Sequence, residues 1–202
     1  MGVTVDPLHI YTAAAATCDH VVQRFGGHGR QPRVFNLSTD GVHTMLDGKV
    51  QWVSRDDEPC NAVICGVPLN VYATEDRQRI ALVLLRKGAE LVAICADRIY
   101  PSPRGLEFGV GATAAMFAYA ANVTPTFCGK PESIFFTELC RRLGFRPEGC
   151  VLVGDNLESD IEGATRVGMS TILTLSGIST RDDLRTAKVQ PGAVIKDLTD
   201  LL

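Results

Sequence analysis

Short apolar runs alternate with amphipathic segments along the chain, most clearly in its last third. The run CVLVGD at 150–155 predicts a buried strand, and STILTLS at 170–176 predicts the next strand. The segment between them predicts a helix, because Ser159 and Glu162 have the spacing of a capping box and Gly168 is a typical helix stop. A strand, a helix and a second strand in this order favour a parallel pair.

Two further helices are predicted on either side of this strand pair. Upstream, Pro131 suits a first helical turn and Gly144 suits a helix end. Downstream, TRDDL predicts a capped helix that opens at Thr180. The upstream helix has one apolar face, formed by Phe135, Leu139 and Leu143.

The middle of the chain repeats the alternation and predicts a separate small α/β unit. TEDRQRIALVLLRKG at 74–88 predicts a helix, and the segments at 25–32 and 122–131 predict the two crossings into and out of this unit. HIYTA at 9–13 predicts one more strand, before the first crossing. The strands predicted within the unit are 33–37, 50–53, 62–67 and 90–97.

Composition is that of an ordinary globular protein, with 46% apolar and 21% charged residues. A formal net charge of −3 argues against nucleic acid or an anionic membrane as the main partner. No apolar run is long enough to predict a membrane span. The start MGVTVD resembles no secretory signal and has Asp6 where a myristoylation signal needs Ser or Thr, so we expect a cytoplasmic location.

The seven cysteines are odd in number and include no C-x-x-C pair. Several lie inside apolar runs, as Cys65 and Cys95 do, so we interpret them as reduced and mostly buried thiols. A zinc site that combines Cys60 and Cys65 with distant histidines is an alternative, which the spacing does not favour.

Carboxylates follow the predicted strand at 150–155. Asp155 is at the carboxyl end of this strand, where α/β sheets bind ligands, and Asp160 is in the first turn of the next predicted helix. Carboxylate oxygens suit Mg²⁺, although Asp155 could instead cap a turn and Asp160 could interact with the helix dipole. Lys130, in a loop that we expect at the same crevice, could neutralise a phosphate.

Residues 129–184 resemble the C-terminal half of the haloacid-dehalogenase-like phosphatases, in the branch of p-nitrophenylphosphatase, phosphoglycolate phosphatase and pyridoxal phosphate phosphatase. The resemblance continues backwards through ADRIYPSPRGLEFGVGA at 96–112 and VDPLHIYTAAAATCDHV at 5–21. It implies a partial Rossmann-like parallel-sheet core with an inserted α/β cap. We therefore expect three segments: core residues 1–32, cap residues 33–127 and core residues 128–202.

The resemblance also implies roles for individual residues. Lys130 would stabilise the phosphate, and Asp155 would bind Mg²⁺ with support from Asp160. Asp97 and Arg104 in the cap would contact the substrate, and we expect Asn156 to do so as well. The implied reaction is magnesium-dependent hydrolysis of a small phosphorylated metabolite through an aspartyl-phosphate.

The family's nucleophile belongs to a D-x-D-G-[TV] motif, which this sequence does not contain. The nearest string is VFNLSTDGVHTML at 34–46, but Ser38 stands two places before Asp40, where the family has its attacking aspartate. A degenerate nucleophile there is a minor alternative. We therefore expect an N-terminally incomplete phosphatase that is inactive alone.

The family's strand order predicts an unusual sheet edge. Its first strand lies between the fourth and the second, and here 9–13, 150–155 and 170–176 would be the third, fourth and fifth strands. The fourth strand would then have a free edge, which a second copy of the chain could cover.

Other functions remain open at this point. The main alternative is a non-catalytic binding or interaction module derived from the same family. A dinucleotide-binding fold that uses GVGATAA at 109–115 is weaker, because G-x-G-x-x-G is incomplete and no predicted strand directly precedes it.

Overall fold

The computed structural model confirms an α/β fold with parallel sheets and divides into two compact units, Met1–Gly129 and Lys130–Leu202. Residues 7, 8 and 28, which fall within the predicted core segment and first crossing, lie outside the described residues. The domain boundaries predicted after residues 32 and 127 stay predictions. No described helix combines the length and the apolar character that crossing a membrane requires. The structure describes residues 4–6, 9–27, 29–67 and 74–201.

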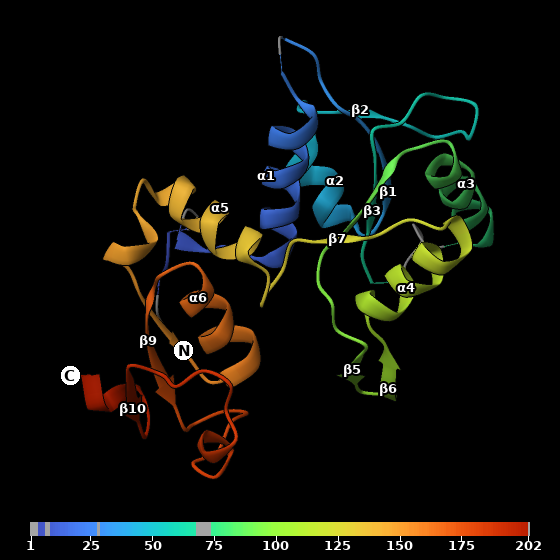
Figure 1. Cartoon of the computed structure of the whole chain (residues 1–202). Helices are drawn as coiled ribbons and strands as arrows, with labels where there is room; N and C mark the ends of the chain where they lie inside the picture. The colour runs from blue at the N-terminus through green and yellow to red at the C-terminus, as the bar shows by residue number, and fades with distance from the viewer. Residues whose placement is uncertain (1–3, 7–8, 28, 68–73, 202) are drawn as a thin grey trace. The chain divides into compact units, whose positions relative to one another are not determined.

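Five strands of the first unit form a parallel sheet in the order β2-β1-β3-β4-β7 (Figure 1). β1 and β3 have strands on both sides, and the residues of β3 are all buried. This burial explains why β3 reads as the continuous apolar run AVIC rather than as an alternating pattern. The strands are β1 (Arg33–Leu37), β2 (Gln51–Trp52), β3 (Ala62–Cys65), β4 (Glu90–Ala93) and β7 (Thr126–Phe127).

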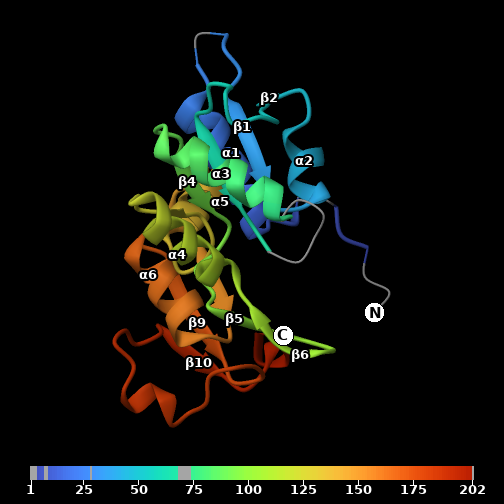
Figure 2. The ribbon, with the colours of Figure 1, turned by 90° about the vertical axis from the view of Figure 1, so that its right-hand side faces the viewer.

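Helices cover both faces of this sheet. Figures 1 and 2 show α1 and α2 on one side of the strands and α3 and α4 on the other. The face towards α3 and α4 contains Phe35, Val63 and Leu91 from the strands, packed against Leu84 and Phe117 from the helices. The helices are α1 (Ala13–Phe25), α2 (Asp40–Leu46), α3 (Glu75–Arg86) and α4 (Val110–Ala121).

The predicted strand at 9–13 is wrong. His9 is in a short 3-10 turn, and α1 begins at Ala13 because the Thr12 hydroxyl accepts a hydrogen bond from the Ala15 amide at 3.1 Å. Among the described strands, none lies beside this segment to pair with it. A capped helix start therefore replaces the strand.

A β-hairpin that the sequence analysis did not predict extends from the first unit (Figure 2). β5 (Ile99–Ser102) pairs antiparallel with β6 (Gly105–Phe108), and Ile99 lies opposite Phe108. Gly105 closes the turn with φ of +114°, a conformation that favours glycine. Ile99 and Phe108 are both exposed.

The second unit has a three-stranded parallel sheet in the order β10-β9-β8. Leu157, Ile161 and Leu173 form the centre of its core. The strands are β8 (Val151–Gly154), β9 (Ser170–Thr174) and β10 (Ala193–Ile195). The helical elements are α5 (Ser133–Leu143), the 3-10 helix η3 (Pro147–Gly149), the π-helix η4 (Leu157–Glu162), α6 (Gly163–Arg166) and the 3-10 helices η5 (Asp183–Arg185) and η6 (Leu198–Leu201).

Three local predictions in this unit need correction. The helix expected from Thr180 is only the single turn η5, although the Asp183 carboxylate accepts hydrogen bonds from both the amide and the hydroxyl of Thr180, as at a helix start. Asn156, not Ser159, caps η4. Pro131 precedes α5 rather than occupying its first turn, and its peptide bond to Lys130 is cis.

β8 forms the edge of its sheet, as the sequence predicted, and pairs only with β9 among the described strands. Val151 in this strand is 60% exposed, although the apolar run VLVG is typical of a buried strand. Within the described residues, one side of this apolar edge strand is therefore not paired with another strand.

Candidate active site

Asp155 lies directly after β8, at the carboxyl end of the parallel sheet. Its Oδ2 atom accepts a hydrogen bond of 2.9 Å from the Ile178 amide, and its main-chain oxygen accepts one of 2.9 Å from the Ser179 amide. Its Oδ1 atom has no hydrogen bond to any described residue. One carboxylate oxygen is therefore held by the loop after β9, and the other is available to a ligand.

Asp160 and Lys130 form an ion pair in the same unit. Nζ of Lys130 donates to Oδ1 of Asp160 at 2.5 Å, and the backbone amide of Asn156 donates to Oδ2 of Asp160 at 3.2 Å. Asp160 is 4% exposed, whereas the Lys130 side chain is 42% exposed. The pair brings together two residues that are 30 positions apart in the sequence. Asp160 therefore holds the Lys130 ammonium group in place, and because the Lys130 side chain is partly exposed, the ammonium group is accessible to an anion.

Two glycines allow this pair to form. A Cβ atom on Gly154 would lie 2.5 Å from the Cβ atom of Asp160, so a side chain there would displace the carboxylate. A Cβ atom on Gly163 would lie 2.5 Å from the Phe136 ring and 2.8 Å from the Pro131 oxygen. The observed position of the Asp160 carboxylate therefore requires glycine at position 154, and close packing of α6 against the start of α5 requires glycine at position 163.

Asn156 shapes the turn between Asp155 and Asp160. Its Oδ1 atom accepts hydrogen bonds from the Glu158 and Ser159 amides at 2.9 and 3.0 Å, which satisfies donors at the start of η4. Its Nδ2 group has no hydrogen bond to a described residue. The side-chain Nδ2 group of Asn156 is therefore the part that is available to a substrate.

The donors fit Mg²⁺ as one part of a coordination shell. Asp155 offers a free carboxylate oxygen, whereas both oxygens of Asp160 already accept hydrogen bonds. No group of three or more His, Cys, Asp or Glu side chains among the described residues could hold a metal ion. Mg²⁺ needs few protein ligands, because it keeps several waters and takes substrate phosphate oxygens. The geometry thus supports Asp155 as a direct ligand and Asp160 as the partner of Lys130.

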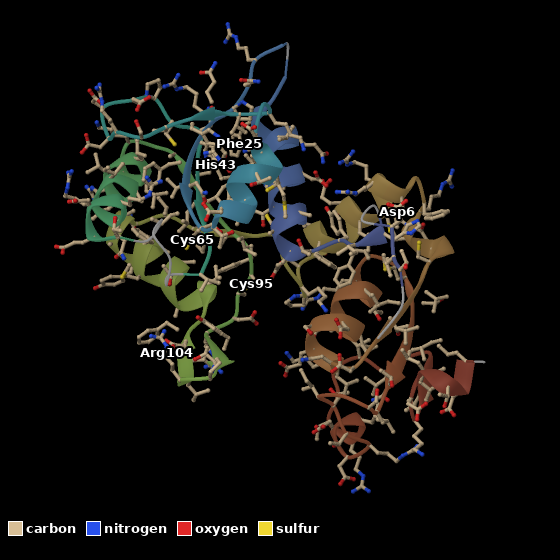
Figure 3. The ribbon with its side chains drawn as sticks, turned by 180° about the vertical axis from the view of Figure 1, so that it is seen from behind. Asp6, Phe25, His43, Cys65, Cys95 and Arg104 are labelled. Carbon is tan, nitrogen blue, oxygen red and sulfur yellow. The ribbon has the colours of Figure 1, made fainter. Side chains whose placement is uncertain are left out.

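The two residues predicted in the cap lie in the first unit. Arg104 is at the turn of the β5–β6 hairpin, as Figure 3 shows, and forms an ion pair of 2.8 Å with Glu107. Asp97 is exposed and lies between β4 and β5, where its main-chain oxygen accepts a hydrogen bond from the Gly111 amide at 2.8 Å. Their role in substrate binding stays a prediction.

Ser38 does not resemble an exposed nucleophile. Ser38 follows β1 in the sheet of the first unit, and its side chain is 0% exposed. A Cβ atom on Gly66 would lie 2.0 Å from the Ser38 hydroxyl oxygen, so this hydroxyl is packed against the chain after β3. Asp40 is the first residue of α2. The buried position of Ser38 argues against direct attack on a substrate.

Sequence reasoning missed the loop 177–179, which contacts Asp155. A Cβ atom on Gly177 would lie 2.0 Å from Oδ2 of Asp155, and Ser179 accepts a hydrogen bond of 3.0 Å from the Leu157 amide. The signal in the sequence was weak, because LSGIST reads as the end of a strand followed by turn residues.

Comparison with known proteins agrees with this architecture. A family model described as "HAD-hyrolase-like" matches residues 127–201. The acid sugar phosphatase of Staphylococcus aureus strain USA300 is 31% identical over 202 residues, which is 100% of this chain and 75% of the relative.

Solved structures give the same result. A mutant of the thermostable p-nitrophenylphosphatase from Bacillus stearothermophilus is 29% identical with a TM-score of 0.84, over 97% of this chain and 74% of that chain. The 4-nitrophenylphosphatase from Thermotoga maritima is 28% identical with a TM-score of 0.84, over 100% of this chain and 74% of that chain. With Lys130 and Asp155 in their observed surroundings, these similarities show that the chain belongs to the haloacid-dehalogenase-like phosphatases, in the p-nitrophenylphosphatase branch.

Proposed function

We propose that this chain supplies the phosphate-binding and metal-binding part of a magnesium-dependent phosphatase for small phosphorylated metabolites. The observation that supports this best is the Lys130–Asp160 ion pair beside Asp155, at the carboxyl end of β8. An ammonium group and a metal-bound carboxylate next to each other are suited to an anion with several negative oxygens. The names of the relatives, a sugar phosphatase and p-nitrophenylphosphatases, support a phosphomonoester as the ligand.

Each residue has a defined task in this proposal. Lys130, positioned by Asp160, neutralises the phosphate. Asp155 uses its free oxygen for Mg²⁺, which would polarise the phosphate when bound. Nδ2 of Asn156 donates to a substrate oxygen. Asp97 and Arg104 stay candidates for substrate contact.

We also propose that this 202-residue polypeptide alone does not turn over substrate. The sequence has no D-x-D-G-[TV] motif, and Ser38 at the nearest string is buried. Loss of a covalent nucleophile costs several orders of magnitude in rate. The alternative is a non-catalytic binding or interaction module derived from the same family, which the absence of a D-x-D-G-[TV] motif from this sequence favours. We also propose a cytoplasmic location, because all seven cysteines are free thiols and disulfides persist mainly in oxidising compartments.

Hydrolysis of p-nitrophenyl phosphate tests the proposal together with metal binding. The chain with Mg²⁺ should release no more p-nitrophenol than a buffer control, while NMR titration should show weak Mg²⁺ binding that Asp155→Asn removes. Glu158→Gln, at an exposed carboxylate of the next turn, is the matched control and should bind as the unmodified chain does. Turnover that Asp155→Asn abolishes would contradict the absence of a nucleophile. Mg²⁺ binding unaffected by Asp155→Asn would contradict the metal site.

Phosphate binding tests the role proposed for Lys130. With Mg²⁺ present, inorganic phosphate should shift the NMR signals of the 155–157 turn, and Lys130→Met should weaken this response. Phosphate that binds equally well to Lys130→Met would argue for a site elsewhere on the chain.

A further inference from the structure

The loop at 177–179, after β9, forms hydrogen bonds with the candidate metal ligand Asp155 and with the turn that follows it. Within three residues, Ile178 donates to the Asp155 side chain, Ser179 donates to the Asp155 main chain, and Ser179 accepts from Leu157. These contacts hold the residues immediately before and after Asn156. The β8–η4 turn is therefore fixed by a segment that is more than twenty residues away along the chain.

We propose that Gly177 and Ser179 are positioning residues for Asp155, which set the carboxylate orientation that Mg²⁺ binding needs. This inference rests on the proposed metal site and adds residues that would act through Asp155 rather than through direct contact with Mg²⁺. Side chains that orient metal ligands commonly change metal affinity about 10- to 100-fold when they are removed.

Ser179 fixes the main chain of the turn. Its hydroxyl oxygen accepts a hydrogen bond of 3.0 Å from the Leu157 amide, a donor at the start of η4 that has no partner within the helix. Ser179 and Leu157 are each 8% exposed, so water cannot readily replace this bond. Without the hydroxyl, the Leu157 amide would be buried without a partner, and the turn that contains Asp155 would shift to satisfy it.

Gly177 fixes the side chain of Asp155 by leaving room for it. A Cβ atom on Gly177 would lie 2.0 Å from Oδ2 and 2.5 Å from Cβ of Asp155. Its φ is not in the left-handed region, so backbone conformation does not require glycine here. Glycine is required at position 177 because a side chain there would overlap the Asp155 carboxylate. Ile178 then donates to Oδ2, which leaves Oδ1 for the metal ion.

A Mg²⁺ titration followed by NMR tests the proposal, with the Ile178 amide as the reporter. Ser179→Ala and Gly177→Ala should each weaken Mg²⁺ binding by about tenfold or more. Ser179→Thr keeps a hydroxyl and should retain most of the affinity. In an Asp155→Asn background, Ser179→Ala should cause no further loss, because the ligand it positions has already been removed.

Matched controls separate positioning from general damage. Ser176→Ala removes a hydroxyl of the same loop that bonds to Thr174 instead, and Gly149→Ala adds a methyl group where no atom lies within 4 Å. Both should bind Mg²⁺ like the unmodified chain. If Ser179→Ala does not fold, the comparison of Gly177→Ala with Gly149→Ala decides, because Gly177 is in an exposed turn.

The metal-free protein gives a second readout that does not depend on the proposed function. The Ile178 amide should exchange with solvent faster in Ser179→Ala, because its acceptor Asp155 is no longer held in place. Unchanged exchange and unchanged Mg²⁺ affinity in both variants would overturn the positioning role. If the unmodified chain binds no Mg²⁺ but exchange still rises, the metal site fails while the positioning of Asp155 stands.

Discussion

Asp160 is almost fully buried, yet both oxygens of its carboxylate accept hydrogen bonds, one from Lys130 and one from the Asn156 amide. A buried carboxylate needs such partners, because an unpaired charge in the protein interior is strongly unfavourable. At the scale of the single residue, the site therefore assigns different tasks to its two aspartates. Asp160 holds Lys130, and Asp155 keeps an oxygen free.

Removing Lys130 should destabilise the second unit. Lys130→Met leaves Asp160 without its cation, and we expect a loss of about 2 kcal/mol in the free energy of unfolding, below the value for a fully buried pair because Lys130 is partly exposed. Chemical denaturation measures this loss. Lys188→Met, at an exposed lysine of the same unit, should change little. The double variant Lys130→Met, Asp160→Asn should recover part of the loss; equal destabilisation by both lysine variants would contradict the pairing.

The elements of the second unit depend on close contact between helices. α6 is only four residues long, and Gly163 at its start lies against the Phe136 ring and the Pro131 oxygen. This contact brings η4, which contains Asp160, next to the loop that contains Lys130.

In the first unit, α4 packs through Val110, Ala114 and Phe117, whose spacing places them on one helical face.

A methyl group at position 163 should separate these elements. Gly163→Ala puts a Cβ atom 2.5 Å from the Phe136 ring, and overpacking of this kind costs about 1–3 kcal/mol. Denaturation with urea should show the loss, and the Phe136 ring signals in NMR spectra should shift. The control Gly149→Ala has open space around it and should be close to neutral. A neutral Gly163→Ala would show that α5 and α6 can move apart freely.

At the scale of the whole molecule, the two sheets differ in how completely they are covered. β3 has a strand on each side and helices over both faces of its sheet. Among the described strands β8 pairs only with β9, and Val151 is exposed. The first unit can therefore bury its central strands, whereas β8 is an edge strand of the second unit's sheet.

Hydrogen exchange should reflect this difference. The amides of β3 and β4 should exchange only through global opening of the first unit, while those of β8 should exchange much faster in a dilute sample. Mass spectrometry of peptides from 62–65 and 151–154 compares them directly. If protection of β8 rises with protein concentration, a second copy covers the edge. Equal protection of both strands at high dilution would mean that the edge is closed within one chain.

Much of this molecule could be predicted from sequence because the signals are local. The buried run of β3, the glycine stop after α5 at Gly144 and the placement of Asp155 after a strand all depend on neighbouring residues. Family resemblance and spacing indicate three residues of the site, and all three lie in the second unit: Lys130, Asp155 and Asp160. The hairpin 99–108 was missed because its strands are short and interrupted by Pro101.

What only the tertiary structure decided depends on contacts between distant segments. HIYTA has strand-like residues, but no described strand lies beside it, and the Thr12 hydroxyl starts a helix instead. No periodicity shows that Lys130 donates to Asp160 or that Ser179 accepts a hydrogen bond from the turn after Asp155. The first contact forms only when the segment before α5 packs against η4 and α6, and the second only when β8 and β9 are paired. The sequence thus determined many of the helices and strands and the chemical groups, because propensity and patterning act within a few residues. The folded sheet determined which oxygen of each aspartate is held and which is free, because hydrogen bonds across loops form only after packing brings their partners together.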